Sequence, residues 1–139
     1  LYLYDGSGWV KISDMDSSTT DARTYTTTFT MPVGGFGVSS TNTLGNISAG
    51  AKITTVSVDV DTAFTGYSGA ITPNIEVGTT SDPDLVCDSP SNDLTELSDY
   101  VCTPDFVYSA SETQDQTIRA RCNHYQSSAG NCTVTLTYV

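Results

Sequence analysis

Apolar and polar residues alternate along several segments of this chain, which is the pattern of β-strands that bury one face. In TVSVDV, Val56, Val58 and Val60 fall on one face, with a serine and aspartates on the other. RTYTTTFTM, residues 23–31, alternates in the same way and places threonines on the face that a solvated strand prefers to expose. AITPNIEV repeats the pattern, but Pro73 lacks a backbone donor, so this strand is expected at a sheet edge or begins near the proline.

The C-terminus favours a β-hairpin, with QTIRARC and CTVTLTYV on either side of the polar loop NHYQSSAGN. Alternation gives each segment one apolar face, made by Ile118, Ala120 and Cys122 on the first and by Cys132, Val134, Leu136 and Tyr138 on the second. Pairing Cys122 opposite Cys132 aligns the remaining apolar positions, so one register satisfies the whole face.

Three other segments complete the pattern. LYLY and WVKI, joined by the turn DGSG, predict a short N-terminal hairpin, whereas MPVGGFGVSSTNTLGN has the glycines and polar residues of a long connection. SNDLTELSDYV suits a short helix capped by Ser91 or Asn92, although a single turn accounts for it equally well. Short strands with turn signals and no strong helix predict an all-β, antiparallel β-sandwich of jelly-roll or immunoglobulin-like topology.

The 139 residues fit one domain that is large enough to bury a core. We expect residues 1–20 to form a hairpin arm and linker, and residues 21–139 to form the β-sandwich domain. The chain begins at Leu1 rather than at methionine, so it is expected to be a processed protein or part of a longer one.

The charge is strongly acidic, with 16 acidic and 5 basic residues and a formal net charge of −11. No basic residue lies between Lys52 and Arg119, so this span is expected to form a negative face, and a role in solubility is favoured over a surface that binds a cation or a basic partner. This balance argues against a surface for nucleic acid or anionic membrane. No apolar run approaches the roughly 20 residues that span a bilayer.

Four cysteines suit either disulfide bonds or a zinc site: Cys87, Cys102, Cys122 and Cys132. Zinc sites are usually built from close pairs, and here the nearest two cysteines are ten positions apart, which weakens that alternative. The shared apolar face favours a Cys122–Cys132 disulfide, and exclusion then joins Cys87 to Cys102. Buried thiols are the next alternative, and disulfides would imply an oxidising environment outside a cell.

Candidate catalytic residues are few, and we predict that the protein is not an enzyme. His124 is the single histidine and falls in the predicted C-terminal loop, where a surface role is commoner than a general base. Asp59 and Asp61 are separated by one residue and would share the solvent face of a strand. Hydrolysis across a cleft would need a distant partner for either carboxylate.

The loop GTTSDPDL holds Asp82 and Asp84 on either side of Pro83, which raises calcium as an alternative to a simple turn. Pro83 fixes its own backbone and steers the residue before it away from helix, and Ser81 can bond to nearby amides. Calcium takes about six to eight oxygen ligands, and the loop lacks EF-hand spacing. We therefore favour a turn, with no cofactor and no bound metal.

Several phrases, in order, resemble the β-sandwich domain of virion surface proteins from tailed bacteriophages, such as head fibres, capsid decoration proteins and tail-fibre modules. These phrases are VSVDVDTAFTG, ITPNIEVGTTSDPDLV, YVCTPDFVYSASET and AGNCTVTLTYV, and LYLYDGSGWVKI is similar to a hairpin that often precedes such domains. The resemblance covers residues 52–139 and this hairpin. The four cysteines depart from the cysteine-poor pattern of the family.

The resemblance implies a non-enzymatic structural subunit on the virion surface, outside the cell, that associates as a homotrimer and with other virion proteins, with a host glycan as a further partner. The N-terminal hairpin is too small to be stable alone, so Tyr2, Tyr4 and Trp9 are expected to be packing anchors. The alternative is a secreted carbohydrate-binding module that uses aromatic residues among Trp9, Tyr67, Tyr100, Tyr108 and Tyr125.

Overall fold

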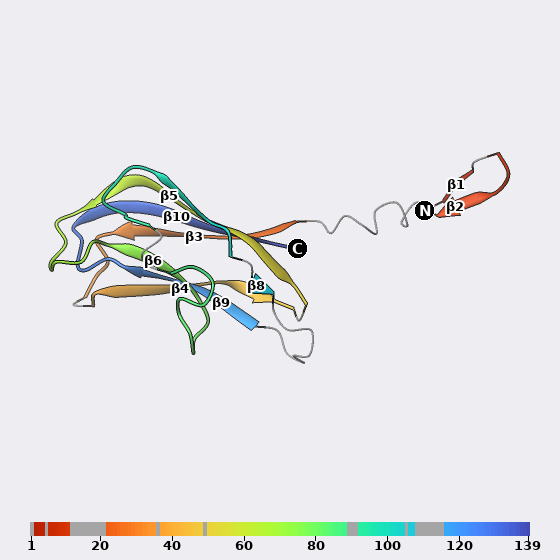
Figure 1. Cartoon of the computed structure of the whole chain (residues 1–139). Helices are drawn as coiled ribbons and strands as arrows, with labels where there is room; N and C mark the ends of the chain where they lie inside the picture. The colour runs from red at the N-terminus through yellow and green to blue at the C-terminus, as the bar shows by residue number, and fades with distance from the viewer. Residues whose placement is uncertain are drawn as a thin grey trace.

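The chain forms a β-sandwich of two antiparallel sheets together with a separate two-stranded hairpin (Figure 1). The computed structural model describes residues 2–4, 6–11, 22–35, 37–48, 50–88, 92–104, 106–107 and 116–139. Its strands are β1 (Tyr2–Tyr4), β2 (Trp9–Lys11), β3 (Arg23–Met31), β4 (Ser39–Ile47), β5 (Lys52–Thr65), β6 (Asn74–Gly78), β7 (Asp99–Cys102), β8 (Phe106–Val107), β9 (Gln116–Asn123) and β10 (Ala129–Tyr138).

The strand order identifies the sandwich as a jelly roll. The large sheet has the order β3-β10-β5-β7, with β8 also paired to β5, and the small sheet has the order β4-β9-β6. Cys87 forms an isolated bridge with Val77 on the other side of β6, at the place of a fourth strand. Successive strands from β3 to β6 alternate between the sheets, and so do β9 and β10. An immunoglobulin-like sandwich instead pairs sequence neighbours within a sheet, so of the two predicted topologies the jelly roll is the one observed.

The predicted hairpin between β9 and β10 is wrong. β9 pairs with β4 and β6, whereas β10 pairs with β3 and β5 in the other sheet. Alternation did assign the two faces correctly, because both strands bury every second residue. The two apolar faces meet across the core instead of lying side by side in one sheet, since a pattern of period two fixes which face is buried but not the neighbouring strand.

Residues 39–47, expected within a long connection, form strand β4. The strand lies at the edge of the small sheet and has only two buried apolar side chains, Leu44 and Ile47. Serine, threonine and asparagine occupy most other positions, so the apolar alternation that marks a strand is nearly absent. The other predicted strands are confirmed, including the start of β6 directly after Pro73 and the pairing of β1 with β2.

The core lies between the two sheets, where both inner faces are apolar. Most of its fully buried side chains come from strands: Ile47 on β4, Ile53, Val56 and Phe64 on β5, Ile75 and Val77 on β6, Ile118 on β9, and Val134 and Leu136 on β10. Burying one such side chain stabilises the fold by about 1.5–3 kcal/mol. The described residues contain no helix, and so none that is long and apolar enough to cross a membrane.

Two stacked tyrosines connect the sheets near one end of the core. The rings of Tyr25 on β3 and Tyr138 on β10 lie 5.2 Å apart, and the Tyr138 hydroxyl donates to that of Tyr25 at 3.1 Å. The Tyr25 hydroxyl donates in turn to the carbonyl oxygen of Asn46 on β4, at 2.8 Å. A Cβ on Gly45 would lie 2.5 Å from the Tyr25 ring, so this crossing requires glycine there.

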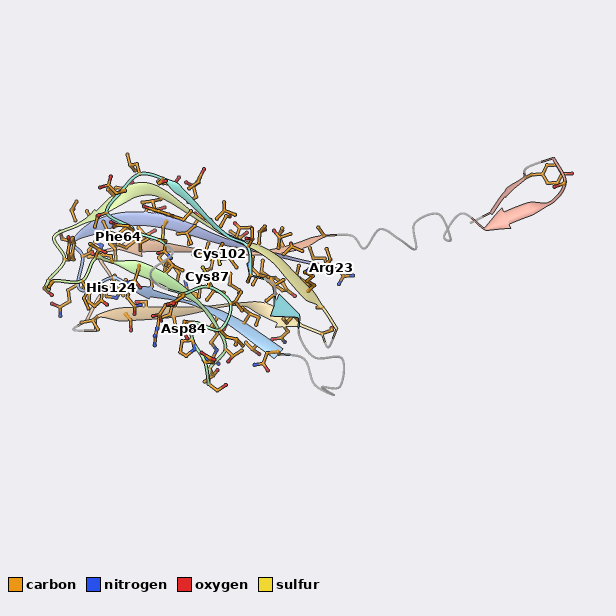
Figure 2. The ribbon with its side chains drawn as sticks, in the orientation of Figure 1. Arg23, Phe64, Asp84, Cys87, Cys102 and His124 are labelled. Atoms are coloured by element: carbon orange, nitrogen blue, oxygen red, sulfur yellow. The ribbon has the colours of Figure 1, made fainter. Side chains whose placement is uncertain are left out.

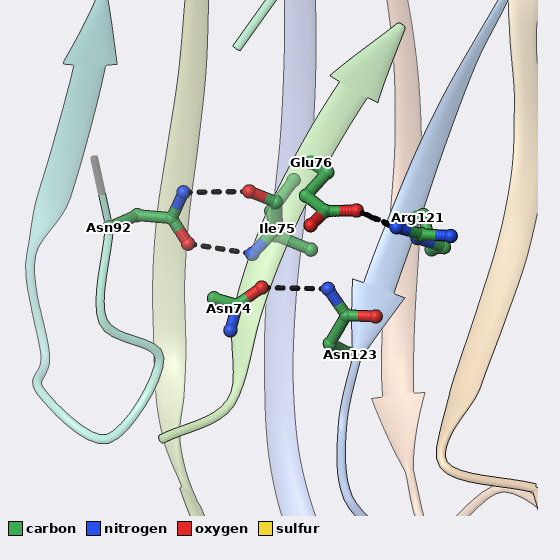
Figure 3. A network of polar contacts seen from close by, with 6 residues as sticks. All are labelled: Asn74, Ile75, Glu76, Asn92, Arg121 and Asn123. Atoms are coloured by element: carbon green, nitrogen blue, oxygen red, sulfur yellow. Dashed lines mark hydrogen bonds and ion pairs between the residues drawn. The ribbon is translucent and has the colours of Figure 1, made fainter. Parts of the chain in front are cut away.

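The segment that suited a helix instead covers the outer edge of β6. Residues 94–95 form a turn, and Asp93 Oδ1 accepts hydrogen bonds from the backbone and hydroxyl of Thr95. The Asn92 side chain accepts from the Ile75 N–H at 2.7 Å and donates to the Ile75 carbonyl oxygen at 2.9 Å (Figure 3). Asn92 thus supplies the two bonds that a neighbouring strand would make to Ile75.

Replacing Asn92 with alanine should lower the free energy of unfolding by about 1–3 kcal/mol, because the buried N–H and C=O of Ile75 lose their partner. Urea unfolding followed by circular dichroism measures this change. Asn46→Ala is the control, since the Asn46 side chain bonds to Thr117 at an exposed position and should matter less. Equal losses for the two variants would contradict the role of Asn92 at this edge.

Candidate functional site

Polar side chains pair across β6 and β9 on the outer face of the small sheet (Figure 3). Asn123 Nδ2 donates to Asn74 Oδ1 at 2.8 Å. One pair further along, Arg121 forms an ion pair with Glu76, through Nε at 2.7 Å and also through Nη2. Glu76 is buried although it points away from the core, so something covers this face of β6.

The cover is the loop of residues 79–88, which folds back over the end of β6. A Cβ on Gly78 would collide with the carbonyl oxygen of Asp82 and come within 2.6 Å of Pro83, so the loop approaches the strand too closely for any side chain there. The Thr79 N–H donates to the Asp82 carbonyl oxygen at 2.8 Å, and the Asp82 N–H donates to Thr79 Oγ1 at 3.1 Å. These bonds make the segment a turn, as the sequence indicated, and Asp84 lies on it in Figure 2.

A cavity of about 140 Å³ lies between this loop and the outer face of the small sheet. Its lining residues are Thr41 on β4, Arg119 and Arg121 on β9, and Thr79, Thr80 and Pro83 of the loop. We call it the Arg119 cavity. The sequence analysis did not single out either arginine. Two features of the sequence could have indicated them: in QTIRARC they alternate with the apolar residues and so fall on the outer face, and they follow a long span without basic residues.

Two pairs of aspartates lie close together at the surface. Asp59 on β5 is directly opposite Asp99 on β7, and a hydrogen bond between their carboxyl groups raises the pKa of Asp59. In the loop, a hydrogen bond with Asp84 likewise raises the pKa of Asp82. The first pair lies on the large sheet and the second over the small sheet, so these two pairs belong to different faces of the sandwich.

The four cysteines carry thiols, so neither predicted disulfide is present in the structure. Cys122 and Cys132 come from opposite sheets and are both fully buried. Their thiols are hydrogen-bonded neighbours, and this contact, followed by burial, raises the pKa of the Cys122 thiol well above its usual range. Cys102 Sγ lies 3.7 Å from the carbonyl oxygen of Val86, the residue before Cys87 (Figure 2). The two cysteines of each predicted pair thus lie in one region of the core, and the formation of a disulfide between them stays a prediction.

His124 is buried, contrary to the surface position expected for it. It begins the connection between β9 and β10, where the chain passes from one sheet to the other (Figure 2). Its Nδ1 accepts from the Gln126 N–H at 3.1 Å, and its Nε2 lies 3.2 Å from Ser40 Oγ. Burial lowers the pKa of His124, so the neutral ring holds the connection in place.

The aromatic residues proposed for sugar binding are dispersed. Tyr100 packs against the core, whereas Tyr67 and Tyr125 lie in adjacent loops joined by a hydrogen bond from the Ser68 N–H to the Tyr125 carbonyl oxygen. Tyr108 lies outside the described residues. In the hairpin, Tyr4 is opposite Trp9, and the Tyr4 side chain is exposed. The side chains of Tyr2 and Trp9 lie outside the described part, so their role as anchors stays a prediction.

Two solved structures contain chains with a similar fold. One is the cyanophage Pam1 capsid asymmetric unit, with a TM-score of 0.57 and 18% sequence identity over 85% of this chain and 84% of that chain. The other is the acidic stable capsid structure of Helicobacter pylori bacteriophage KHP30, with a TM-score of 0.59 and 15% identity over 86% and 87% of the two chains. At these identities the likeness establishes the fold alone. No family model matches this chain, and no curated protein matches it either.

In the reduced protein, Cys122 should resist alkylation by iodoacetamide in the native state and react fully after unfolding in urea. Burial and the raised pKa keep its thiolate, the reactive form, scarce in the folded state. Cys102 is half-buried and should react sooner, which makes it an internal control. Mass spectrometry of the labelled peptides gives both rates. If Cys122 reacted as fast as Cys102 in the native reduced protein, its protection by burial would be refuted; if it stayed unlabelled in unfolded, unreduced protein, the predicted Cys122–Cys132 disulfide would be present.

Asp59→Asn should flatten the dependence of stability on pH. The pKa of Asp59 is raised from 3.8 in the folded state, so its protonation stabilises the fold. This contribution is complete below the ordinary pKa and is lost as pH rises through the raised value. Urea unfolding between about pH 3 and about pH 7 measures the slope. Glu96→Gln is the control, because it removes an exposed carboxylate elsewhere, and its stability should depend on pH as that of the wild type does. If the stability of Asp59→Asn also followed the wild-type profile, the interaction of Asp59 with Asp99 would be refuted.

Proposed function

We propose that this chain is a non-enzymatic structural subunit of a bacteriophage virion surface. The observation that carries the proposal is the jelly-roll fold, which aligns with chains of two phage capsid structures over more than four fifths of both partners. Each aligned pair is therefore similar in length, so the likeness extends to the sandwich as a whole. The phrases that resemble fibre and decoration domains point in the same direction.

The environment of the one histidine supports a structural role. Both ring nitrogens of His124 are within hydrogen-bond distance of the chain's own groups, Nδ1 of the Gln126 N–H and Nε2 of Ser40. A general base needs a nitrogen that is available to a reacting group, and this ring is also buried. The side chain most often used for acid–base catalysis thus stabilises a connection instead.

We propose assembly into a homotrimer through the N-terminal hairpin. A two-stranded ribbon is marginally stable in water on its own, so it gains stability by packing on another surface. The aromatic positions of the ribbon provide apolar area for this contact: Tyr4 is exposed, and its position is directly opposite Trp9. The sandwich has its own buried core and does not require these aromatics.

Light scattering coupled to size-exclusion chromatography should give three times the chain mass for the wild type. Replacing Tyr4 and Trp9 together with serine should shift the mass toward the monomer, because the ribbon loses its apolar anchors. Tyr67→Ser is the matched control, since it removes a tyrosine from a sandwich loop and should leave the mass unchanged.

Virion membership is tested by isolating phage particles that carry the gene and identifying the chain among their proteins by mass spectrometry. Recovery with capsid or tail proteins in a fixed ratio is the expected result. A monomer at high micromolar concentration that binds a soluble oligosaccharide would overturn the proposal in favour of a secreted carbohydrate-binding module.

A further inference from the structure

We propose that the Arg119 cavity is a binding site for a single carboxylate group, with Arg119 as its principal ligand. The inference is independent of the proposed virion role, because it follows from how the side chains of the cavity are partnered. Arg119 and Arg121 are two of only five basic residues in a chain of net charge −11, and both line the same small space.

The two arginines differ in what they already bind. Arg121 is engaged by Glu76, which neutralises its charge and fixes its guanidinium on the outer face of β9. The Arg119 side chain makes no hydrogen bond or ion pair with any described residue, and its Nε is buried without a partner. A buried, unsatisfied donor on a charged group is costly, and proteins normally pair such groups. The Arg119 guanidinium is therefore the group in the cavity that lacks its counter-ion.

Charge and size favour a carboxylate over other anions. With Glu76 beside Arg121, the residues that line the cavity leave one positive charge uncompensated, which matches a monoanion better than a phosphate dianion. A planar guanidinium can donate two parallel hydrogen bonds to the two oxygens of a carboxylate. The volume of about 140 Å³ exceeds the roughly 30 Å³ share of one water several-fold, so a carboxylate and the carbon that bears it fit.

The remaining lining supplies uncharged donors and a rigid wall. Thr41 on the edge strand and Thr80 in the loop of residues 79–88 both line the cavity, and each carries a hydroxyl group that can donate a hydrogen bond. That loop is held by its own turn bonds and by its close approach to Gly78, so the cavity is formed before a ligand arrives. A preformed site loses less conformational entropy on binding.

The carboxylate can come from two sources: an aspartate or glutamate side chain of a second copy of this chain, or a free carboxylate such as acetate or a sugar acid. The chain is rich in exposed acids, so copies can supply the group to one another. The guanidinium chemistry is the same in both cases, and the experiment separates them.

Titration with sodium acetate, followed by NMR of the arginine Nε–Hε resonances, tests the site in the full chain. We expect a saturable shift of the Arg119 signal, and no such shift with sodium chloride at the same ionic strength. Arg119→Gln should weaken acetate binding by about tenfold or more, since it removes the charge that the bidentate contact needs. Arg23→Gln, which removes an exposed arginine from β3, should bind as the wild type does.

Because a glutamine variant can fail for structural reasons, Arg119→Met is measured as well. Removing an unpaired buried donor should leave the melting temperature unchanged or raised, while acetate binding is lost. If acetate also dissociates an oligomer of the wild type, a carboxylate of a second copy fills the site; if the oligomer persists, the ligand is a free carboxylate. No saturable shift, a shift with inorganic phosphate alone, or equal binding by Arg119→Gln would overturn the proposal.

Discussion

The contact between the inward faces of β9 and β10 is the constraint on which the rest of this fold depends. The two strands are adjacent in the sequence but belong to opposite sheets, and each buries every second side chain. Sheets that pack face to face lie about 10 Å apart, so the short connection between these strands must bridge that distance. Buried His124 and the left-handed backbone of Tyr125 and Gln126 form this crossing. His124 thus stabilises the crossing that this topology requires.

The strands and their buried faces could be predicted from the sequence because alternation is a local property. Val56, Val58 and Val60 are buried as their pattern indicated, and the inner faces of β9 and β10 are the expected ones. The pairing of strands could not be predicted, because antiparallel neighbours and facing sheets demand the same pattern of apolar positions. Strand β4 gave too weak a signal, since an edge strand with one solvated face needs few apolar residues. The Arg119 cavity depends on how a loop folds over a neighbouring strand, which no local pattern encodes.

The edges and outer faces of the two sheets differ in the side chains and segments that cover them. Asn92 and Cys87 occupy the free edge of β6, so this edge is closed to pairing with another chain. The outer face of β3 and β10 is covered by threonines, and hydroxyl pairs such as Thr26 with Thr135 and Thr28 with Thr133 satisfy one another. An uncharged, hydroxyl-bearing sheet face can approach a neighbouring protein without burying a charge. The outer face of the small sheet instead carries the half-buried Glu76–Arg121 ion pair and the overlying loop, so the two outer faces of the sandwich suit different contacts.

Protonation of His124 and protonation of the surface aspartate pairs have opposite effects on the stability of the fold. Burial lowers the pKa of His124, so its contribution to stability is present above its ordinary pKa and is lost as pH falls through the lowered value. Protonation would also remove the acceptor for the Gln126 N–H and so weaken the crossing between the sheets. The aspartate pairs behave in the reverse manner, because the raised pKa values of Asp59 and Asp82 favour their protonated forms in the folded state. Acidification therefore stabilises the aspartate pairs at the surface and destabilises the connection between β9 and β10. On the acidic side the buried imidazole therefore opposes folding, whereas the surface aspartate pairs favour it.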